Sequence, residues 1–339
     1  MSAVTQNSRS KLSVVVIGRN EGARLEYCLE SVRAMRFDGE MEVIYVDSGS
    51  NDGSVPLAER LGAKTIALTP LRPTAALGRN AGWRAASGET VLFLDGDTVL
   101  NENFAAAAMR EFKDASVACV WGHRREMHPR ETMYNRVLDL DWIYAPGPAE
   151  FCGGDALFRR SALVEVGGFD DSLIAGEEPE MCRRMIAAGH RILHVDLAMT
   201  QHDLAMKSFR QYWARATRAG HAYAEVSSRF TQSGDAFWSA EASRNRLQVL
   251  ALGLLVIVGV ATSVWMQSAW PVAGMLAVLC ALALRTAWKA RWKSTNAWTL
   301  LLYGAHSHLQ QVPICMGQMR YAWNHRRGRR IGIVEYKQS

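Results

Sequence analysis

An unbroken apolar run, Val91 to Leu94, leads directly into the acidic sequence Asp95-Gly96-Asp97. Apolar residues without alternation predict a strand of a parallel sheet that is covered on both faces. In open α/β sheets, ligands bind beyond the carboxyl ends of such strands. Two carboxylates that point the same way from one segment, together with substrate phosphates, are the usual ligands of a hard divalent cation. The pattern therefore predicts a metal–diphosphate site holding Mn²⁺ or Mg²⁺, with a plain polar turn as the alternative.

Apolar runs alternate with helical patterns in the first part of the chain. Strands are expected over residues 12–17, 43–46 and 63–68, each followed by a polar loop and a helix. This alternation predicts a mostly parallel α/β sheet flanked by helices. The signatures Gly-x-Gly-x-x-Gly and Gly-x-x-x-x-Gly-Lys-Ser/Thr are both absent, which argues against a dinucleotide-binding Rossmann protein and a P-loop NTPase. A nucleotidyltransferase would be expected to carry a Gly-rich basic loop after the first strand, where only Arg19 is basic.

Later polar segments add further candidate residues. Pro179 suits the first turn of a helix, so Glu177 and Glu178 are expected near the positive end of that helix dipole. Plain capping of the helix is the alternative role for the two glutamates. His202 follows a short strand that is expected over residues 191–195, and a lone histidine is usually a hydrogen-bonded structural side chain. Residues 102–149 show no regular pattern.

The charge of the chain is divided between its two parts. Residues 1–203 contain 22 Lys and Arg against 29 Asp and Glu, whereas residues 204–339 contain 17 against 4. The basic residues of the second part flank long apolar segments, which favours a membrane surface over nucleic acid as the partner. The six cysteines include no Cys-x-x-Cys pair, which favours a reducing compartment over a zinc or disulfide framework. The N-terminus has no signal-peptide core, so the first part is expected in the cytosol.

The second part contains two segments that could cross a bilayer, about 247–266 and 269–288. Tryptophans bracket the pair, and basic residues lie at its outer ends but not in its connection, so a hairpin with both ends in the cytosol is expected. A buried helical hairpin in a soluble protein is the alternative. Residues 209–223 form a stripe that fits an interfacial helix or a core helix. Residues 297–319 are expected to form an interfacial or re-entrant helix, and residues 320–330 a basic cluster for anionic headgroups.

Seven stretches occur in an order and spacing that resembles glycosyltransferase family 2, the inverting sugar transferases of GT-A fold. The resemblance covers residues 11–225. It lies in a strand followed by Arg-Asn-Glu, then Val-Asp-Ser-Gly-Ser-Asn-Asp-Gly-Ser, Gly-Arg-Asn-Ala-Gly, Phe-Leu-Asp-Gly-Asp, Gly-Gly-Asp, Gly-Gly-Phe-Asp and Gly-Glu-Glu-Pro-Glu. The chain departs from the family where Asp-Asp is replaced by Asp47-Ser48, and where Glu178 stands in place of Asp.

The resemblance implies a role for each matching residue. Asp95 and Asp97 would form the metal-binding Asp-x-Asp motif, with His202 as a further ligand. Glu178 would be the general base, although Glu177 stays open as an alternative. The remaining implied residues bind the nucleotide-sugar donor. They are Asn20, Glu21, Asp47 and Asp52 at the nucleoside, Arg79 at the diphosphate, Asp95, and the segment Gly153, Gly154 and Asp155 that faces the donor sugar.

These expectations describe a membrane-associated transferase. A flexible segment 1–10 would precede a catalytic domain over residues 11–230, and residues 231–339 would form a membrane-associated helical region. The donor would be a UDP- or GDP-sugar, and the acceptor a lipid-linked or cell-envelope saccharide at the cytosolic face of the inner membrane. A polyprenyl-phosphate glycosyltransferase and a non-catalytic membrane scaffold of the same fold are the alternatives.

Overall fold

The computed structural model describes residues 11–328, in two compact units. Unit 1 comprises residues 11–127 and 144–203, and unit 2 comprises residues 128–143 and 204–328. The expected flexible segment 1–10 and the end of the chain, residues 329–339, lie outside the described residues.

Unit 1 is built on one mixed, mostly parallel sheet, which within residues 11–328 has nine strands. The strand order is β3-β2-β1-β4-β8-β6-β9-β5, and β7 pairs with β9. β1, β2, β3 and β4 are mutually parallel, whereas β8 is antiparallel to its neighbours β4 and β6. The strands are β1 (Lys11–Gly18), β2 (Glu40–Asp47), β3 (Lys64–Ala67), β4 (Thr90–Asp95), β5 (Thr98–Leu100), β6 (Val117–Glu126), β7 (Gly147–Ala149), β8 (Ala156–Arg159) and β9 (Arg191–His202).

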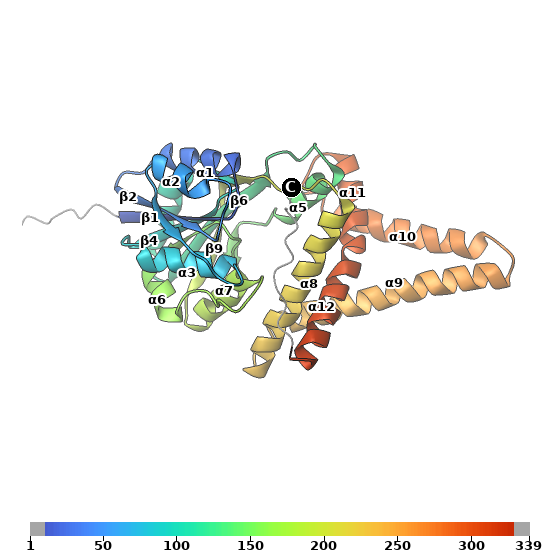
Figure 1. Cartoon of the computed structure of the whole chain (residues 1–339). Helices are drawn as coiled ribbons and strands as arrows, with labels where there is room; N and C mark the ends of the chain where they lie inside the picture. Colours follow the sequence, from blue (N-terminus) through green and yellow to red (C-terminus); the bar gives the residue numbers. More distant parts are fainter. Residues whose placement is uncertain (1–10, 329–339) are drawn as a thin grey trace, which may run out of the picture. The chain divides into compact units, whose positions relative to one another are not determined.

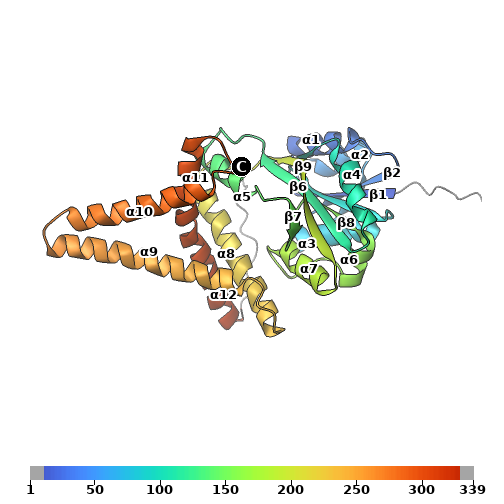
Figure 2. The same ribbon diagram turned by 180° about the vertical axis from the view of Figure 1, so that it is seen from behind.

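Helices cover both faces of this sheet, with α1 and α2 on one side and α3, α6 and α7 on the other (Figures 1 and 2). The apolar run Val91 to Leu94 is the buried part of β4, and its side chains have no exposed surface. This confirms the prediction of a strand covered on both faces. The helices of unit 1 are α1 (Ala23–Arg33), α2 (Ser54–Arg60), α3 (Ala75–Ala85), α4 (Phe104–Ala108), the 3₁₀ helix η1 (Met109–Lys113), α6 (Arg160–Val166) and α7 (Glu177–Ala187).

Two strands of the sheet differ from the sequence prediction. β6 lies in residues 102–149, where no regular pattern was expected, although its first five residues are apolar. β9 was expected to end at Val195 but continues to His202. It does so because its second half pairs with β5 as well as β6, with shifts of register along β6.

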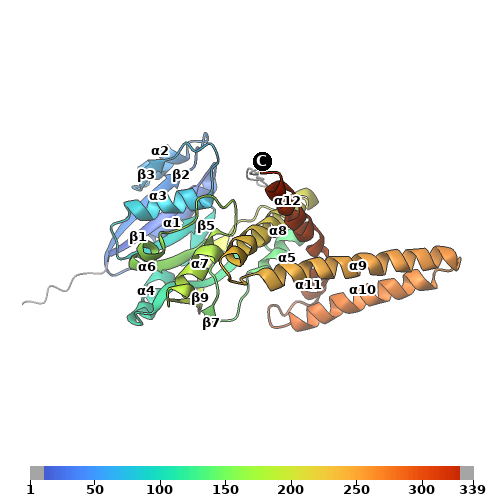
Figure 3. The ribbon, with the colours of Figure 1, turned by 90° about the horizontal axis from the view of Figure 1, so that it is seen from below.

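Unit 2 is helical. α9 and α10 form an antiparallel hairpin, and α8 and α12 lie side by side across its base (Figures 1 and 3). α8 and α12 approach closely because Gly220 has no side chain; a Cβ there would lie 1.9 Å from the carbonyl oxygen of Ile314. The helices are α5 (Met133–Asp141), α8 (Phe209–Gln232), α9 (Ser239–Trp265), α10 (Trp270–Lys289), α11 (Ala297–Leu309) and α12 (Gln311–Arg326).

α9 and α10 are long and apolar enough to cross a membrane, with mean hydropathies of 2.3 and 1.6 over their most apolar windows. Only 6% of each window is buried, which is not the burial of a core helix. α11 and α12 also carry apolar side chains on their outer surfaces, while their polar residues Thr299, His306 and Gln318 are buried. The exposed large apolar residues of these two helices are Trp298, Leu301, Leu309, Met316, Met319 and Trp323.

Residues 209–230 lie in α8, which belongs to unit 2, and the predicted catalytic domain over residues 11–230 stays a prediction. One helical segment differs from its predicted form. The single helix expected over residues 297–319 is two helices that meet at Gln310. Pro313 has no N–H to donate to the carbonyl of Leu309, so α11 ends there and Pro313 falls in the first turn of α12.

Candidate active site

The carboxyl ends of three parallel strands bring the expected residues of unit 1 to one edge of the sheet. Gly18 at the end of β1 is in register with Asp47 at the end of β2. Its neighbour Ile17 is in register with Asp95 at the end of β4. Residues far apart in the sequence therefore meet at one level of the sheet, where ligands of open α/β sheets bind.

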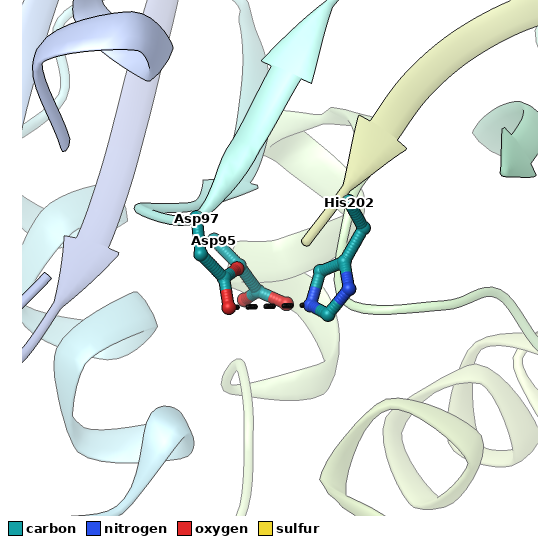
Figure 4. A group of neighbouring side chains, drawn as sticks. All are labelled: Asp95, Asp97 and His202. Carbon is teal, nitrogen blue, oxygen red and sulfur yellow. Dashed lines mark ion pairs between the residues drawn. The ribbon is translucent and has the colours of Figure 1, made fainter. Parts of the chain in front are cut away.

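Asp95, Asp97 and His202 form a cluster that could hold a metal ion (Figure 4). Asp97 lies in the turn between β4 and β5, and Thr98 at the start of β5 pairs with His202 at the end of β9. This pairing places His202 Nε2 3.3 Å from Asp97 Oδ2. One ligand atom from each of the three residues lies within 4.8 Å of the others. Carboxylate oxygens with an imidazole nitrogen suit a divalent cation such as Mn²⁺.

Asp155 stabilises the carboxyl end of β4 through hydrogen bonds. Its buried carboxylate accepts hydrogen bonds from the backbone N–H of Asp95 (2.9 Å) and from the hydroxyl of Thr200 (2.8 Å). Burial raises the pKa of Asp155, and the nearby guanidinium of Arg124 opposes this effect. The position was expected to face the donor sugar; in this structure its carboxylate holds the backbone that carries the candidate metal ligands Asp95 and Asp97.

Arg79, on α3, is shared by three carboxylates. Its guanidinium nitrogens lie 2.9 Å from Asp95 Oδ1, 2.9 Å from Glu177 Oε1 and 3.0 Å from Glu178 Oε1. The side chain is only 2% exposed. Burial alone would lower the pKa of Arg79, but the surrounding carboxylates outweigh it and raise that pKa. Arg79 therefore connects the metal cluster to the glutamates, and its contact with a diphosphate stays a prediction.

Glu177 and Glu178 are the first two residues of α7, as expected from Pro179. The side chain of Glu178 is 16% exposed, against 5% for Glu177. Burial and the neighbouring charge of Glu177 raise the pKa of Glu178 to about 7, while Arg79 acts in the opposite direction. Of the two glutamates, Glu178 is therefore the more accessible, with a pKa suited to proton transfer near neutral pH.

The loops after β1 and β2 hold each other through the side chains expected at the nucleoside. Asp47 is buried and accepts hydrogen bonds from Gly49 N–H (2.9 Å), Ser50 N–H (2.8 Å), the Ser50 hydroxyl and the Tyr45 hydroxyl. Across the two loops, Asn20 Oδ1 accepts from Asn51 N–H (2.9 Å) and Asp52 accepts from Gly22 N–H (2.9 Å). Glu21 forms an ion pair with Arg24 at 3.0 Å. The expected residues are thus brought together at the end of the sheet.

Gly153 and Gly154 run past this cluster. A Cβ at Gly154 would lie 2.6 Å from Arg79 Nη2 and 2.9 Å from Asp95 Oδ2, so only glycine allows the backbone to pass so closely. A Cβ at Gly153 would meet nothing within 4 Å. The segment therefore leaves open space on one side and contacts the arginine–carboxylate cluster on the other.

Sequence reasoning missed Arg124. Its guanidinium, on β6, lies 3.4 Å from Asp95 Oδ2 and 3.7 Å from Asp155 Oδ2. The apolar run Val117 to Trp121 was the available signal, because it marks a strand whose far end carries Arg124 to the sheet edge.

Comparison with known proteins relates this geometry to a family. The model of glycosyl transferase family 2 matches residues 13–167. The chain is 29% identical over 216 residues to the pre-mycofactocin glycosyltransferase of Mycobacterium tuberculosis, covering 58% of this chain and 43% of that protein. It is 24% identical over 311 residues to an N-acetylglucosaminyltransferase of Rhizobium sp., covering 83% and 69% respectively. The chain thus spans less than half the length of the first of these relatives.

Two solved structures share the fold. The mannosyltransferase PcManGT from Pyrobaculum calidifontis, in complex with GDP-Man and Mn²⁺, matches with a TM-score of 0.63 at 20% identity, covering 94% of this chain and 88% of that one. S. aureus TarS 1–349, in complex with UDP-GlcNAc, matches with a TM-score of 0.51 at 16% identity, covering 94% and 93%. At these identities the likeness concerns the fold, and it confirms the expected GT-A architecture. The family match over residues 13–167 and the glycosyltransferase relatives together support a family 2 glycosyltransferase domain in this part of the chain.

Proposed function

We propose that this protein transfers a sugar from a nucleoside-diphosphate sugar to an acceptor hydroxyl, with inversion at the anomeric carbon. The observation that carries the proposal is the connection from the Asp95–Asp97–His202 cluster through Arg79 to Glu178. The leaving diphosphate needs positive charge nearby, and the incoming hydroxyl needs a base that accepts its proton, so both must lie in one active site. Both kinds of group meet at this edge of the sheet.

Asp97, His202 and Asp95 would hold the metal ion. Their two carboxylates and one imidazole fit Mn²⁺ well, and Mg²⁺ is the second candidate. When bound, the ion would neutralise charge that develops on the leaving diphosphate. Asp155 would keep the two aspartates in position through the backbone of Asp95, and Arg124 would add positive charge to the same place.

Glu178 would act as the general base. Its carboxylate, with a pKa of about 7, would accept the proton of the acceptor hydroxyl as the oxygen attacks the anomeric carbon. The bond to the diphosphate breaks in the same displacement, so the configuration inverts. Glu177 would hold Arg79 in place and keep the pKa of Glu178 raised. A non-catalytic scaffold would have no use for this set of buried charges.

The donor would be a UDP- or GDP-sugar bound beside Asp47, Asn20, Glu21 and Asp52. In support, PcManGT was solved with GDP-Man and TarS 1–349 with UDP-GlcNAc. The two bound donors differ in their nucleobase, guanine in one and uracil in the other. They therefore support a nucleoside-diphosphate sugar as the class of donor, without selecting its nucleobase.

We further propose that the protein works at the cytosolic face of the inner membrane on a lipid-linked or cell-envelope saccharide. The apolar outer surfaces of α9 and α10 support a membrane hairpin, and the outward Trp298, Met319 and Trp323 support α11 and α12 as interfacial helices. Positive charge at the base of the hairpin supports a cytosolic orientation by the positive-inside rule. The basic residues concerned are Arg244, Arg246, Arg285, Lys289 and Arg291.

The test is a panel of UDP- and GDP-sugars incubated with the detergent-purified protein, with Mn²⁺, Mg²⁺ or chelator. We expect metal-dependent release of UDP or GDP from one donor, and incorporation of its sugar when membrane lipid extract is added. The Asp97→Ala variant serves as the inactive control. If no donor were cleaved under any of these conditions, the proposed function would be wrong.

A further inference from the structure

We infer that Asn80 is a positioning residue for the proposed reaction: it clamps the turn Gly167-Gly168-Phe169 and so fixes the distance between Arg79 and Glu178. The inference rests on the proposed function, but it assigns a role to two sequence stretches that the reaction itself leaves unexplained. These stretches are Arg79-Asn80-Ala81-Gly82 on α3 and Gly167-Gly168-Phe169-Asp170 after α6.

The side chain of Asn80 is 1% exposed and makes four hydrogen bonds. Its Nδ2 donates to the carbonyl oxygen of Phe169 (2.8 Å) and to Asp171 Oδ1 (2.5 Å). Its Oδ1 accepts from the backbone N–H of Phe169 (3.0 Å) and from Trp83 Nε1 (2.8 Å). An amide donates from its nitrogen and accepts at its oxygen, so it can hold both backbone groups of one residue, which a carboxylate with acceptors alone cannot do.

Gly168 allows the turn to dock on this amide. Its φ is +77°, and a Cβ there would lie 2.5 Å from Asn80 Oδ1 and 2.7 Å from Trp83 Nε1. Any side chain at Gly168 would therefore displace the turn from α3.

Arg184 of α7 also bonds this turn. Its guanidinium donates to the carbonyl oxygens of Val166 and Gly168, the latter at 2.7 Å. It is itself held by two bonds to Glu180, at 2.7 and 2.6 Å. The turn is thus a spacer with α3 on one side and the helix that carries Glu178 on the other.

Phe169 extends the clamp to the metal cluster. Its ring lies 5.6 Å from the guanidinium carbon of Arg79 and packs edge-on against Phe93 of β4, with centroids 5.4 Å apart. Phe93 lies two residues before Asp95 on the same strand. β4 is held independently by its pairing with β1 and β8, so holding Phe169 positions α3 and α7 against it, and with them Arg79 and Glu178.

The experiment compares Asn80→Ala and Gly168→Ala, which break the clamp from its two sides, with the control Ser172→Ala in the same loop. Ser172 is exposed, and its hydroxyl donates to Asp170 Oδ1 rather than to Asn80. Binding of the nucleoside diphosphate in the presence of Mn²⁺ is measured by titration calorimetry. The stoichiometry of binding gives the number of functional sites per chain. Turnover per site is then determined, and hydrogen exchange is followed over residues 174–182 and over β4.

We expect turnover per site to fall about 100-fold in both clamp variants, as for a small misplacement of reacting groups. The Kd for the nucleotide should stay within about threefold of the wild-type value, since the residues expected at the nucleoside are untouched. Amides of residues 174–182 should exchange about tenfold faster, with β4 unchanged and Ser172→Ala like wild type. A purely structural role would lower the number of functional sites without changing turnover at each.

Turnover per site within about threefold of wild type, or nucleotide binding lost in parallel with turnover, would overturn the inference. If Asn80→Ala does not fold, Gly168→Ala and Arg184→Lys carry the same test. Should the wild-type protein cleave no sugar nucleotide, the proposed function fails, and the exchange measurement still decides whether Asn80 holds α7.

Discussion

The two units of the molecule bury polar side chains in opposite ways. In unit 1 they converge at one edge of the sheet, from strand ends and from helices, as Arg79 of α3 contacts Asp95 of β4 and Glu178 of α7. In unit 2 they lie between helices, where Asn245 donates to Gln311 Oε1 (2.7 Å) and the hydroxyl of Tyr212 bonds His306 Nδ1 (2.8 Å). The outer surfaces of α9 and α10 in unit 2 carry large apolar side chains where those of a water-soluble bundle would be polar.

This difference indicates what surrounds each unit. Buried charges are costly unless they are paired or used, so a converging set at a sheet edge is a sign of chemistry. Between helices, polar contacts hold elements together without help from the hydrophobic effect, as in an apolar medium. Unit 1 is therefore interpreted as the reaction site in water, and unit 2 as its attachment to lipid.

Removing a proposed metal ligand should have the largest effect and would show that the buried charges of unit 1 perform chemistry. We expect Asp97→Ala to lower kcat/KM by at least about 1,000-fold, because charge on the leaving diphosphate would lose its partner. Kinetics with saturating Mn²⁺ measure this, and circular dichroism verifies the fold. Activity close to that of wild type would remove Asp97 from the metal site.

The proposed base should come next. Glu178→Gln keeps the size of the side chain but cannot accept the proton, so kcat should fall about 100-fold with little change in donor binding. Glu177→Gln is the matched control and should cost less, because the Glu177 side chain is the more buried of the two and is not the proposed base. A larger loss in Glu177→Gln than in Glu178→Gln would exchange the two roles.

A single charge on the hairpin tests the other half of the comparison. Leu254 is 63% exposed on α9, and Leu254→Arg should disfavour insertion by about 3 kcal/mol if that surface faces lipid. Carbonate extraction of membranes measures the inserted fraction. Met41→Arg, on an exposed position of unit 1, is the control that should not change it. Equal extraction of both variants would mean that α9 does not face lipid.

The smallest effect concerns pH. Since the pKa of Glu178 is raised to about 7, its base form should predominate above pH 7 and decline tenfold for each unit below it. Turnover at saturating donor should therefore rise up to about pH 7 and level off above it. The residual activity of Glu178→Gln should lack this acidic limb. If the loss of turnover below pH 7 persisted unchanged in Glu178→Gln, it would reflect the titration of a group other than Glu178.

Much of unit 1 could be predicted because its signals are local. A buried strand followed by Asp95 and Asp97 is visible within seven residues, and Pro179 marks the start of the helix that carries Glu177 and Glu178. The contacts of His202, Arg124 and Asn80 could not be predicted from the residues alone. Each depends on pairing between distant segments, such as the shifts of register between β6 and β9.

The apolar helices of unit 2 could be predicted from composition, but which helices pack together in this unit could not. The apolar segments of α9 and α10 are evident from hydropathy, whereas the stripe of α8 fits an interfacial helix and a core helix of the catalytic domain almost equally well. Its partner α12 lies some 90 residues away, and the close contact at Gly220 leaves no mark in the local pattern. The extent of the catalytic domain stays a prediction.

Electron paramagnetic resonance of Mn²⁺ titrated into the purified protein with UDP or GDP tests the central claim most directly. If Asp95, Asp97 and His202 hold the cation of a nucleotide-sugar site, one Mn²⁺ should bind per chain in the presence of a nucleotide, and Asp97→Ala should abolish that signal. Equal Mn²⁺ binding by wild type and Asp97→Ala, or none by wild type with either nucleotide, would contradict the account.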